Sequence, residues 1–293
     1  MIEFGMSIEG ELTSESLDLP QVRINRVKNQ REWEETHEVT FGLAFEVRVS
    51  QIRNQIYKGY SKLVGQAPDE VRAYREKSQV RFGDKVVEFE YVGKEMVAER
   101  TDQYFQLMDE LYYELRSCPE DKIEAATFRF IAVMNTLGML IHPYSDGNGQ
   151  TLRLLSLSYL HELVPETSKL FFPYKSMASA EGFAFRLGFV WIDNSSDPVA
   201  IGRSLTDMVD KKTTFLLTPE GKKLLTDYVM DHDTEEMGLI VGRSDKRLYL
   251  LDTLRDLDCL VEDIKNNLKN WISLDSSFYA ALELKNQSKG VRV

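Results

Sequence analysis

Two strongly apolar helical segments flank one short polar loop, and this arrangement constrains the fold more than any other feature of the chain. Residues 120–141 are apolar almost all round, which is typical of a helix buried at the centre of a domain. We expect this helix to stop at His142, because Pro143 disfavours helical geometry in the residue before it. A polar loop at 144–149 follows, and a second apolar helix is predicted over 150–163. The core is therefore expected to be helical.

One stretch of the chain has strand character. Residues 80–92 are rich in β-branched and aromatic side chains on both sides of a Gly-Asp pair at 83–84, which predicts a short hairpin. The segment before it, 67–77, has the pattern of a helix. The segment after it, 101–116, predicts a helix with an apolar stripe, and Thr101 is its expected N-cap.

The C-terminal part also contains a helical pattern, whereas residues 165–210 show no clear periodicity. The expected helix carries apolar residues at alternating spacings of four and three: Leu250, Leu254, Leu257, Val261, Ile264, Leu268 and Trp271. Such a stripe either packs on its own domain or forms a surface for self-association as a homo-oligomer or for binding a partner. The predicted fold class is mainly α, with one β-hairpin and additional C-terminal helices. The expected organisation is an N-terminal helical segment (1–60), a core (61–210) and a C-terminal helical region (211–293).

Composition narrows the function classes. The formal net charge of −11 argues against non-specific nucleic-acid binding, which requires clustered Lys and Arg. Cys118 and Cys259 fit neither a disulfide framework nor a zinc site. The first residues lack the apolar core of a Sec signal, and the longest apolar run, 130–141, is too short to span a bilayer. We therefore expect a cytoplasmic protein that is not bound to a membrane, with export by a non-Sec secretion system left open.

The loop between the two apolar helices has the composition of an anion-binding site. Gly147 and Gly149 permit backbone geometry that turns successive N–H groups into one concavity. The helix that starts near Gln150 adds the partial positive charge of its N-terminus. Together these features favour the binding of phosphate oxygens.

Three side chains around this loop supply reactive groups. Asp146 is a hard carboxylate suited to Mg²⁺, which usually keeps water and phosphate oxygens among its ligands. Arg153, one turn into the helix, is placed to reach a terminal phosphate. His142 is the nearby group that accepts a proton close to neutral pH. The set fits attack of a hydroxyl on a phosphate, and the chain lacks the GxxxxGK[ST] sequence of a Walker-A loop.

The string HPYSDGNGQTLR at 142–153 resembles the signature of the Fic family, HPFx[DE]GNGRxxR. The match includes His142, Pro143, Asp146, Gly147, Asn148, Gly149 and Arg153. The resemblance implies a Fic-type helical core with a hairpin "flap" at 80–92 that presents a target protein. It also implies a protein adenylyltransferase that moves AMP from ATP to a Ser, Thr or Tyr hydroxyl. In this assignment His142 is the base, and Asp146 holds Mg²⁺.

The same resemblance implies which residues bind the nucleotide triphosphate. Asn148 and the N–H groups of Gly147 and Gly149 would hold its phosphates, and Arg153 would grip the γ-phosphate. Gln150 stands where the family has its first arginine, which removes a positive charge from the pocket. That difference leaves two alternatives open: another donor such as UTP, GTP or CDP-choline, or a Fic-fold binding protein with weakened catalysis. A third alternative, removal of AMP, would depend on Glu9.

A second family feature concerns the N-terminus. Many Fic proteins carry an inhibitory helix, [ST]xxxE[GN], whose glutamate pairs with the last arginine of the signature. Glu9-Gly10 resembles the end of that helix, although Gly5 stands at its hydroxyl position. Glu9 is therefore a candidate inhibitory residue that would pair with Arg153. An ordinary Glu-Gly pair in the N-terminal segment is the alternative.

Overall fold

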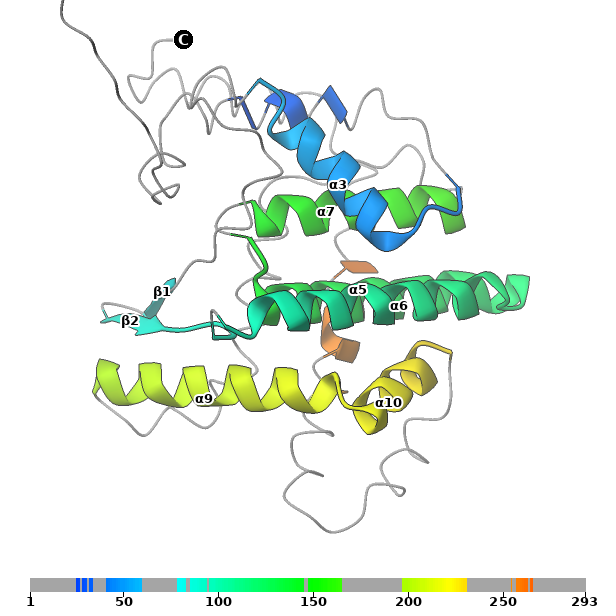
Figure 1. Ribbon diagram of the computed structural model, residues 1–293. Helices are drawn as coiled ribbons and strands as arrows, with labels where there is room; N and C mark the ends of the chain where they lie inside the picture. The colour runs from blue at the N-terminus through cyan, green and yellow to red at the C-terminus, as the bar shows by residue number, and fades with distance from the viewer. Residues whose placement is uncertain are drawn as a thin grey trace, which may run out of the picture.

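The computed structural model describes residues 25–26, 28–30, 32–33, 41–59, 78–82, 85–93, 95–144, 147–164, 197–230, 254, 257–262 and 264–265. Its elements in chain order are α3 (Phe45–Ile56), β1 (Ser78–Phe82), β2 (Lys85–Phe89), α5 (Val97–Arg116), α6 (Glu120–Ile141), α7 (Asn148–Leu163), α9 (Pro198–Leu216) and α10 (Pro219–Val229). Figure 1 shows three rows of helices, with α3 and α7 above, α5 and α6 in the middle, and α9 and α10 below. The mainly α fold class with one hairpin is confirmed.

The centre of the fold is α6, as its apolar composition predicts. Every residue from Phe130 to Ile141 is buried, and the helix packs against α5, α7, α9 and α10. The helix is long and apolar enough to cross a membrane by length and composition, yet 78% of its most apolar window is buried inside the fold. Because α6 ends at Ile141, the central position of this helix also determines where His142 lies.

The predicted cap of α5 is wrong. The helix begins at Val97, four residues before Thr101. The Thr101 hydroxyl donates to the Val97 carbonyl (2.7 Å) within the first turn, so it supports a helix that is already formed. The start of the helix is instead bonded to Gly93, whose carbonyl accepts from the N–H groups of Met96 (2.8 Å) and Val97 (3.1 Å). A threonine inside the first turn is hard to distinguish from a cap by sequence alone.

The predicted hairpin is present, and it packs on a helix that the sequence analysis did not assign. Strands β1 and β2 pair antiparallel, with Ser78 opposite Phe89 and Phe82 opposite Lys85. A Cβ added to Gly202 of α9 would lie 2.0 Å from the Glu88 carbonyl oxygen, so only glycine lets this helix approach the β2 backbone so closely. Residues 83–84 and the predicted helix at 67–77 lie outside the residues that the structure describes.

Helix α9 does carry a start signal in the sequence. The Asp197 carboxylate accepts from the Val199 N–H (3.0 Å), and Pro198 is the first helical residue. An Asp cap followed by Pro is a common way to begin a helix. Residues 165–196 of the unassigned stretch lie outside the described part of the chain.

The C-terminal stripe contributes to the main core where it is described. Leu254, Leu257 and Val261 are buried in the same apolar cluster as α6, and Ile264 packs against that cluster. These side chains therefore pack on their own chain, as one of the two alternatives predicts. Leu250, Leu268 and Trp271 lie outside the described residues, so self-association through them stays a prediction.

A buried ion pair joins α3 to the C-terminal end of α7. Arg48 Nη2 donates to Glu162 Oε2 at 2.6 Å, and both side chains are 3% exposed. The Tyr112 hydroxyl of α5 donates to the other oxygen of Glu162. Burial, followed by the hydrogen bond to Glu162, raises the pKa of Tyr112 to about 12, so its hydroxyl stays protonated at neutral pH. The guanidinium of Arg48 also lies 4.3 Å from the ring centroid of Tyr159. The network thus ties three helices together.

Candidate functional site

His142 occupies the turn at the end of α6 in a left-handed conformation. Its φ is 52° and its ψ is 57°, and it is the only non-glycine residue with positive φ in the described part of the chain. The His142 N–H bonds to the Gly138 carbonyl at 3.1 Å. A left-handed conformation costs a non-glycine residue roughly 1–2 kcal/mol, so the surrounding structure must hold it there. The strain lies at the residue predicted to be the base.

Tyr91 holds the His142 ring. The two rings stack with centroids 3.9 Å apart and planes 6° apart, and the residues are 4% and 9% exposed. Tyr91 lies two residues after β2, so the outgoing end of the hairpin fixes the plane of the imidazole. Stacking covers one face of the ring, and the Nδ1 atom of His142 is buried. Nothing in the sequence near His142 indicates this partner, which lies about fifty residues earlier.

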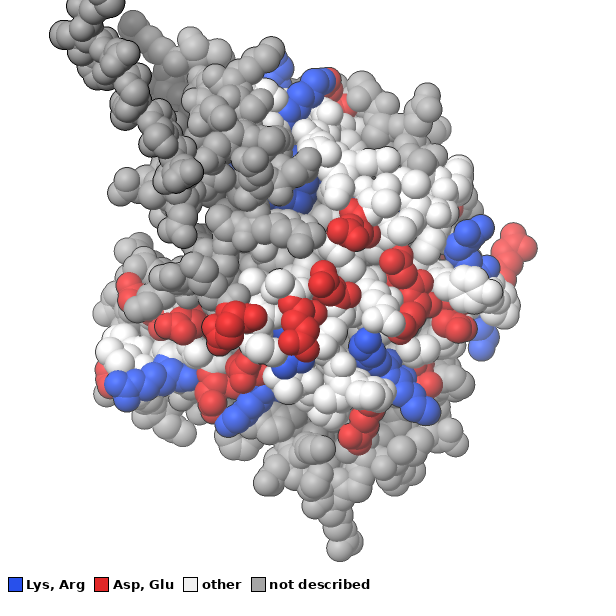
Figure 2. Space-filling model, viewed as in Figure 1, with Lys and Arg blue, Asp and Glu red and all other residues white. Residues whose placement is uncertain are grey.

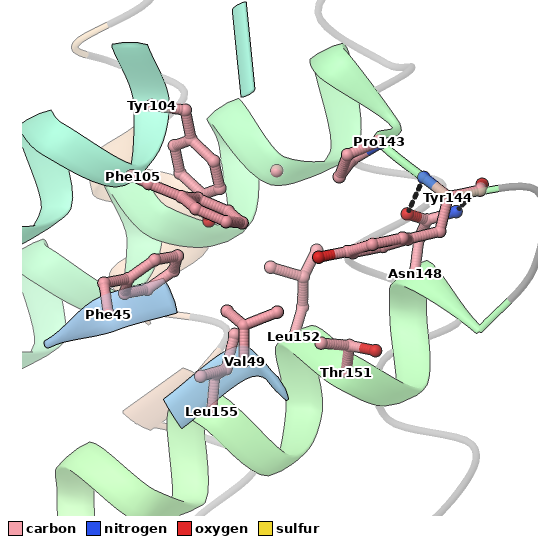
Figure 3. A pocket seen from close by; sticks show the side chains of 11 residues that line it. Phe45, Val49, Tyr104, Phe105, Pro143, Tyr144, Asn148, Thr151, Leu152 and Leu155 are labelled. Atoms are coloured by element: carbon pink, nitrogen blue, oxygen red, sulfur yellow. Dashed lines mark hydrogen bonds between the residues drawn. The ribbon is translucent and has the colours of Figure 1, made fainter. Parts of the chain in front are cut away.

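The loop after His142 is braced by Asn148. Its side-chain oxygen accepts from the Tyr144 N–H (3.1 Å), and its side-chain nitrogen donates to the Tyr144 carbonyl (2.5 Å). Figure 3 shows these two bonds between the start of α7 and the turn after Pro143. The Asn148 side chain therefore shapes the loop, a role that the sequence analysis did not include.

Gly147 forms the N-cap of α7 in a left-handed conformation, with φ 75°. Its carbonyl accepts from the N–H of Thr151 (2.8 Å) and from the hydroxyl of Thr151 (2.9 Å). The helix starts at Asn148, two residues before the predicted start at Gln150. The first N–H groups of a helix have no partner inside it, so the predicted anion-binding end would consist of the N–H groups of residues 148–150.

Arg53 of α3 and Tyr57, the residue that follows α3, support the loop, and sequence reasoning missed both. The Arg53 guanidinium lies 3.5 Å from the ring centroid of Tyr144 and 5.1 Å from that of Tyr57. Arg53 also donates to the Thr151 hydroxyl at 3.3 Å, and it is only 4% exposed. The one available signal was the i, i+4 spacing of Arg53 and Tyr57, which places them on one face of a helix.

Gln150 is buried, 8% exposed, and bonded to the N-terminal part of the chain. Its Nε2 donates to Gln30 Oε1 at 3.2 Å. The neighbouring Asn29 donates to the carbonyls of Ile56 (2.9 Å) and Lys58 (3.0 Å), which anchors this segment on the end of α3. An amide pair thus occupies the position where the family signature has an arginine. Gln30 lies 120 residues from Gln150, and no sequence signal connected them.

A small cavity lies behind the loop, lined by residues that include Tyr104, Tyr144 and Leu152 (Figure 3). Its volume is about 20 Å³, which is space for roughly one water molecule. The Tyr104 hydroxyl donates to the Met134 carbonyl at 2.9 Å, and burial raises the Tyr104 pKa well above its usual value. This cavity is packing space, so a nucleotide is expected on the outer side of the loop.

The structure brings most of the predicted site residues together. His142, Gly147, Asn148, Gly149, Gln150 and Arg153 lie at the end of α6, in the loop and in the first turns of α7. Arg153 is 7% exposed on α7. Asp146 and Glu9 lie outside the described residues, so their predicted roles stay predictions. Among the described residues no group of three or more His, Cys, Asp or Glu side chains is placed to hold a metal ion.

Gly147→Ala is expected to disrupt the loop. The new Cβ would lie 2.5 Å from the Tyr57 hydroxyl oxygen, and alanine is strained at φ 75°. We expect a loss of roughly 1–3 kcal/mol in the free energy of unfolding, measured by urea denaturation. Adding Tyr57→Phe removes the clashing oxygen and is expected to restore part of the loss. If the single variant is as stable as the parent, the close contact between α3 and the loop is wrong.

The family comparison agrees with this geometry. Residues 46–160 match the model of the Fic/DOC family. That range includes the hairpin, the central helix, the loop and most of α7. The chain therefore contains a Fic-type domain over these residues, and the match supports a Fic-type enzyme. No curated protein and no solved structure matches the chain.

Proposed function

We propose that this chain is a protein adenylyltransferase that moves AMP from Mg-ATP onto a Ser, Thr or Tyr hydroxyl of a target protein. One observation carries the proposal. His142 and the open N-terminus of α7 lie at the two ends of a single loop, which Asn148 braces from within. A proton acceptor and an anion-binding helix end at fixed positions are what hydroxyl attack on a phosphate requires.

In the proposed step the target hydroxyl oxygen bonds to the α-phosphorus of ATP. The bond from that phosphorus to the bridging oxygen of the β-phosphate breaks, and pyrophosphate leaves. His142 takes the hydroxyl proton as the new bond forms. The backbone N–H groups of residues 147–149 hold phosphate oxygens, and Arg153 donates to the terminal phosphate.

The site also suits Mg²⁺ that is bound to the phosphates of a nucleotide. Mg²⁺ usually takes one or two carboxylates and completes its ligands with water and phosphate oxygens. Asp146, next to Gly147 in the sequence, would supply that carboxylate. When bound, the ion neutralises phosphate charge.

Incubation of the full chain with labelled nucleotides tests the proposal. ATP labelled in the adenosine or the α-phosphate is expected to label the protein itself, whereas ATP labelled in the γ-phosphate is not. Parallel incubations with labelled UTP, GTP and CDP-choline identify a different donor. Absence of label from all four donors, on the chain and on proteins of a cell extract, would overturn the proposal and leave a binding protein with a Fic fold or an enzyme that removes AMP.

A second candidate, a Fic enzyme with another donor, is favoured by the pairing of Gln150 with Gln30. The two amides carry no charge, so this part of the site attracts a triphosphate less strongly than an arginine would. A donor with fewer phosphate charges, such as CDP-choline, tolerates that difference better than ATP does.

Gln150→Arg is expected to tighten ATP binding roughly ten- to a hundredfold, because a charge-assisted hydrogen bond contributes about 1.5–3 kcal/mol. The new guanidinium can still donate to Gln30 Oε1, so the local contact is retained. Calorimetric titration with ATP measures the change. Gln150→Lys is the control, and its gain is expected to be smaller because a lysine lacks the two-pronged geometry of a guanidinium. Unchanged or weaker binding by the arginine variant would show that residue 150 lies outside the phosphate site.

A further inference from the structure

A groove runs between the end of the hairpin and α9. Its volume is about 870 Å³, within the range of roughly 300–1,000 Å³ that is typical of binding clefts. β2 and the segment after it form one side, and α9 forms the other. Part of the lining is apolar and includes Met96, Pro198 and Val199. Val199 is 59% exposed, one of the few large apolar side chains at the surface of the described residues.

The rim of this groove is acidic. Its carboxylates are Glu88, Glu90, Glu95, Asp207 and Asp210, and the one basic residue among the described lining is Arg203. Asp207 also pairs with Lys211 at 2.5 Å. Figure 2 shows acidic side chains in a row across this face, at the level where α9 meets β2 and α5. Negative charge therefore exceeds positive charge around an apolar floor.

The groove lies next to the reacting histidine. Tyr91 is one of the lining residues. Its ring also stacks on the ring of His142, with the two centroids 3.9 Å apart. The groove therefore shares one residue, Tyr91, with the surroundings of His142. The Glu90 N–H is bonded to the Thr206 hydroxyl (2.9 Å), which joins the two sides of the groove in one rigid unit.

We propose that this groove binds a segment of the target protein in which lysine or arginine residues flank the hydroxyl to be modified. The proposal rests on the proposed function and names the class of its substrate. Carboxylates on both sides of the groove attract cationic side chains, and the apolar floor accommodates the stems of those side chains or an apolar neighbour. A nucleic acid would be repelled by the same charges, and a lone metal ion would leave the apolar floor unused.

Peptide binding tests this proposal without any transfer reaction. The probe is a fluorescein-labelled peptide in which a serine is flanked by lysines and leucines, and fluorescence anisotropy is measured with the full chain in the absence of nucleotide. Matched peptides carry glutamine or glutamate in place of lysine. The lysine peptide is expected to bind most tightly and to lose affinity as salt rises. Equal binding of the glutamine peptide overturns the proposal.

Two triple variants with the same net charge locate the binding. The first, Glu90→Gln with Glu95→Gln and Asp210→Asn, removes three charges from the groove. The second, Glu110→Gln with Glu114→Gln and Glu124→Gln, removes three from exposed positions on α5 and α6. We expect the groove variant to weaken lysine-peptide binding roughly tenfold and the control to leave it unchanged. Equal weakening by both would mean that net charge alone attracts the peptide, which overturns the proposal.

A gain-of-affinity variant guards against loss through misfolding. Arg203→Glu replaces the basic residue of the groove and is expected to tighten lysine-peptide binding several-fold. If Arg203→Glu does not tighten lysine-peptide binding, the groove proposal is wrong. All of these binding measurements omit nucleotide, so they do not depend on the transfer reaction. If the peptide binds as expected but no nucleotide is transferred, the groove proposal is supported and only the proposed activity is wrong. If the chain labels itself but does not bind the lysine peptide, the proposed activity is supported and the groove proposal is wrong.

Discussion

His142→Asn is expected to lower nucleotide transfer by roughly two to four orders of magnitude, because it removes the general base while keeping the backbone conformation. The residue at this position has φ 52°, and asparagine is among the non-glycine residues that best tolerate that region. Labelled-nucleotide incorporation measures the transfer, and urea denaturation measures the free energy of unfolding. Transfer at the parent rate by His142→Asn would exclude His142 as the base.

His142→Ala serves as the comparison for this experiment. Alanine loses both the base and the ring that stacks on Tyr91, and it is strained at positive φ. We expect equal loss of transfer in the two variants but a lower free energy of unfolding for alanine, by about 1 kcal/mol or more. That pattern separates the chemical role of the imidazole from the structural role of the residue.

The largest stability effect is expected at Arg48 of α3, whose partner Glu162 lies at the end of α7 that is far from the loop. Arg48→Ala leaves the Glu162 carboxylate, only 3% exposed, without the guanidinium that it contacts at 2.6 Å. Breaking a buried pair by removing one partner costs about 3–5 kcal/mol. Because a domain is typically stable by only about 5–15 kcal/mol, this single change brings the fold close to unfolding. Urea denaturation at neutral pH measures the effect.

Two controls make the Arg48 experiment specific. Lys58→Ala removes an ion pair of similar length, Lys58 to Glu32 at 2.7 Å, whose side chains are 58% and 42% exposed. It is expected to cost less than about 1 kcal/mol. The double variant Arg48→Met with Glu162→Gln removes both charges but keeps an oxygen that accepts from Tyr112, so it should recover much of the loss. If Arg48→Ala costs no more than Lys58→Ala, the buried pair does not stabilise the fold.

The sequence by itself determined the parts of this protein that depend on near neighbours in the chain. The bounds of α6, the turn at His142-Pro143 and a hairpin close to the predicted 80–92 follow from apolar periodicity, proline geometry and turn residues. Helix α7 was also expected, although it begins two residues before the predicted start at Gln150. The same stretch contains the signature from which the family was expected, and residues 46–160 match that family. The errors were local as well: Thr101 is not the cap of α5, and the Asp197-Pro198 start of α9 was overlooked.

Only the tertiary structure decided what surrounds the loop. Tyr91 on His142, Arg53 on Tyr144, and Gln30 on Gln150 join residues that are 51, 91 and 120 positions apart in the sequence. No pattern within one segment predicts such pairs, because the periodicity and capping residues that form a helix or strand do not specify which distant residue it contacts. The pairs form when burial of the apolar faces of α3, α6 and α7 brings their polar neighbours within bonding distance. The residues of the loop therefore indicate its chemistry, whereas packing against distant segments holds the loop in place.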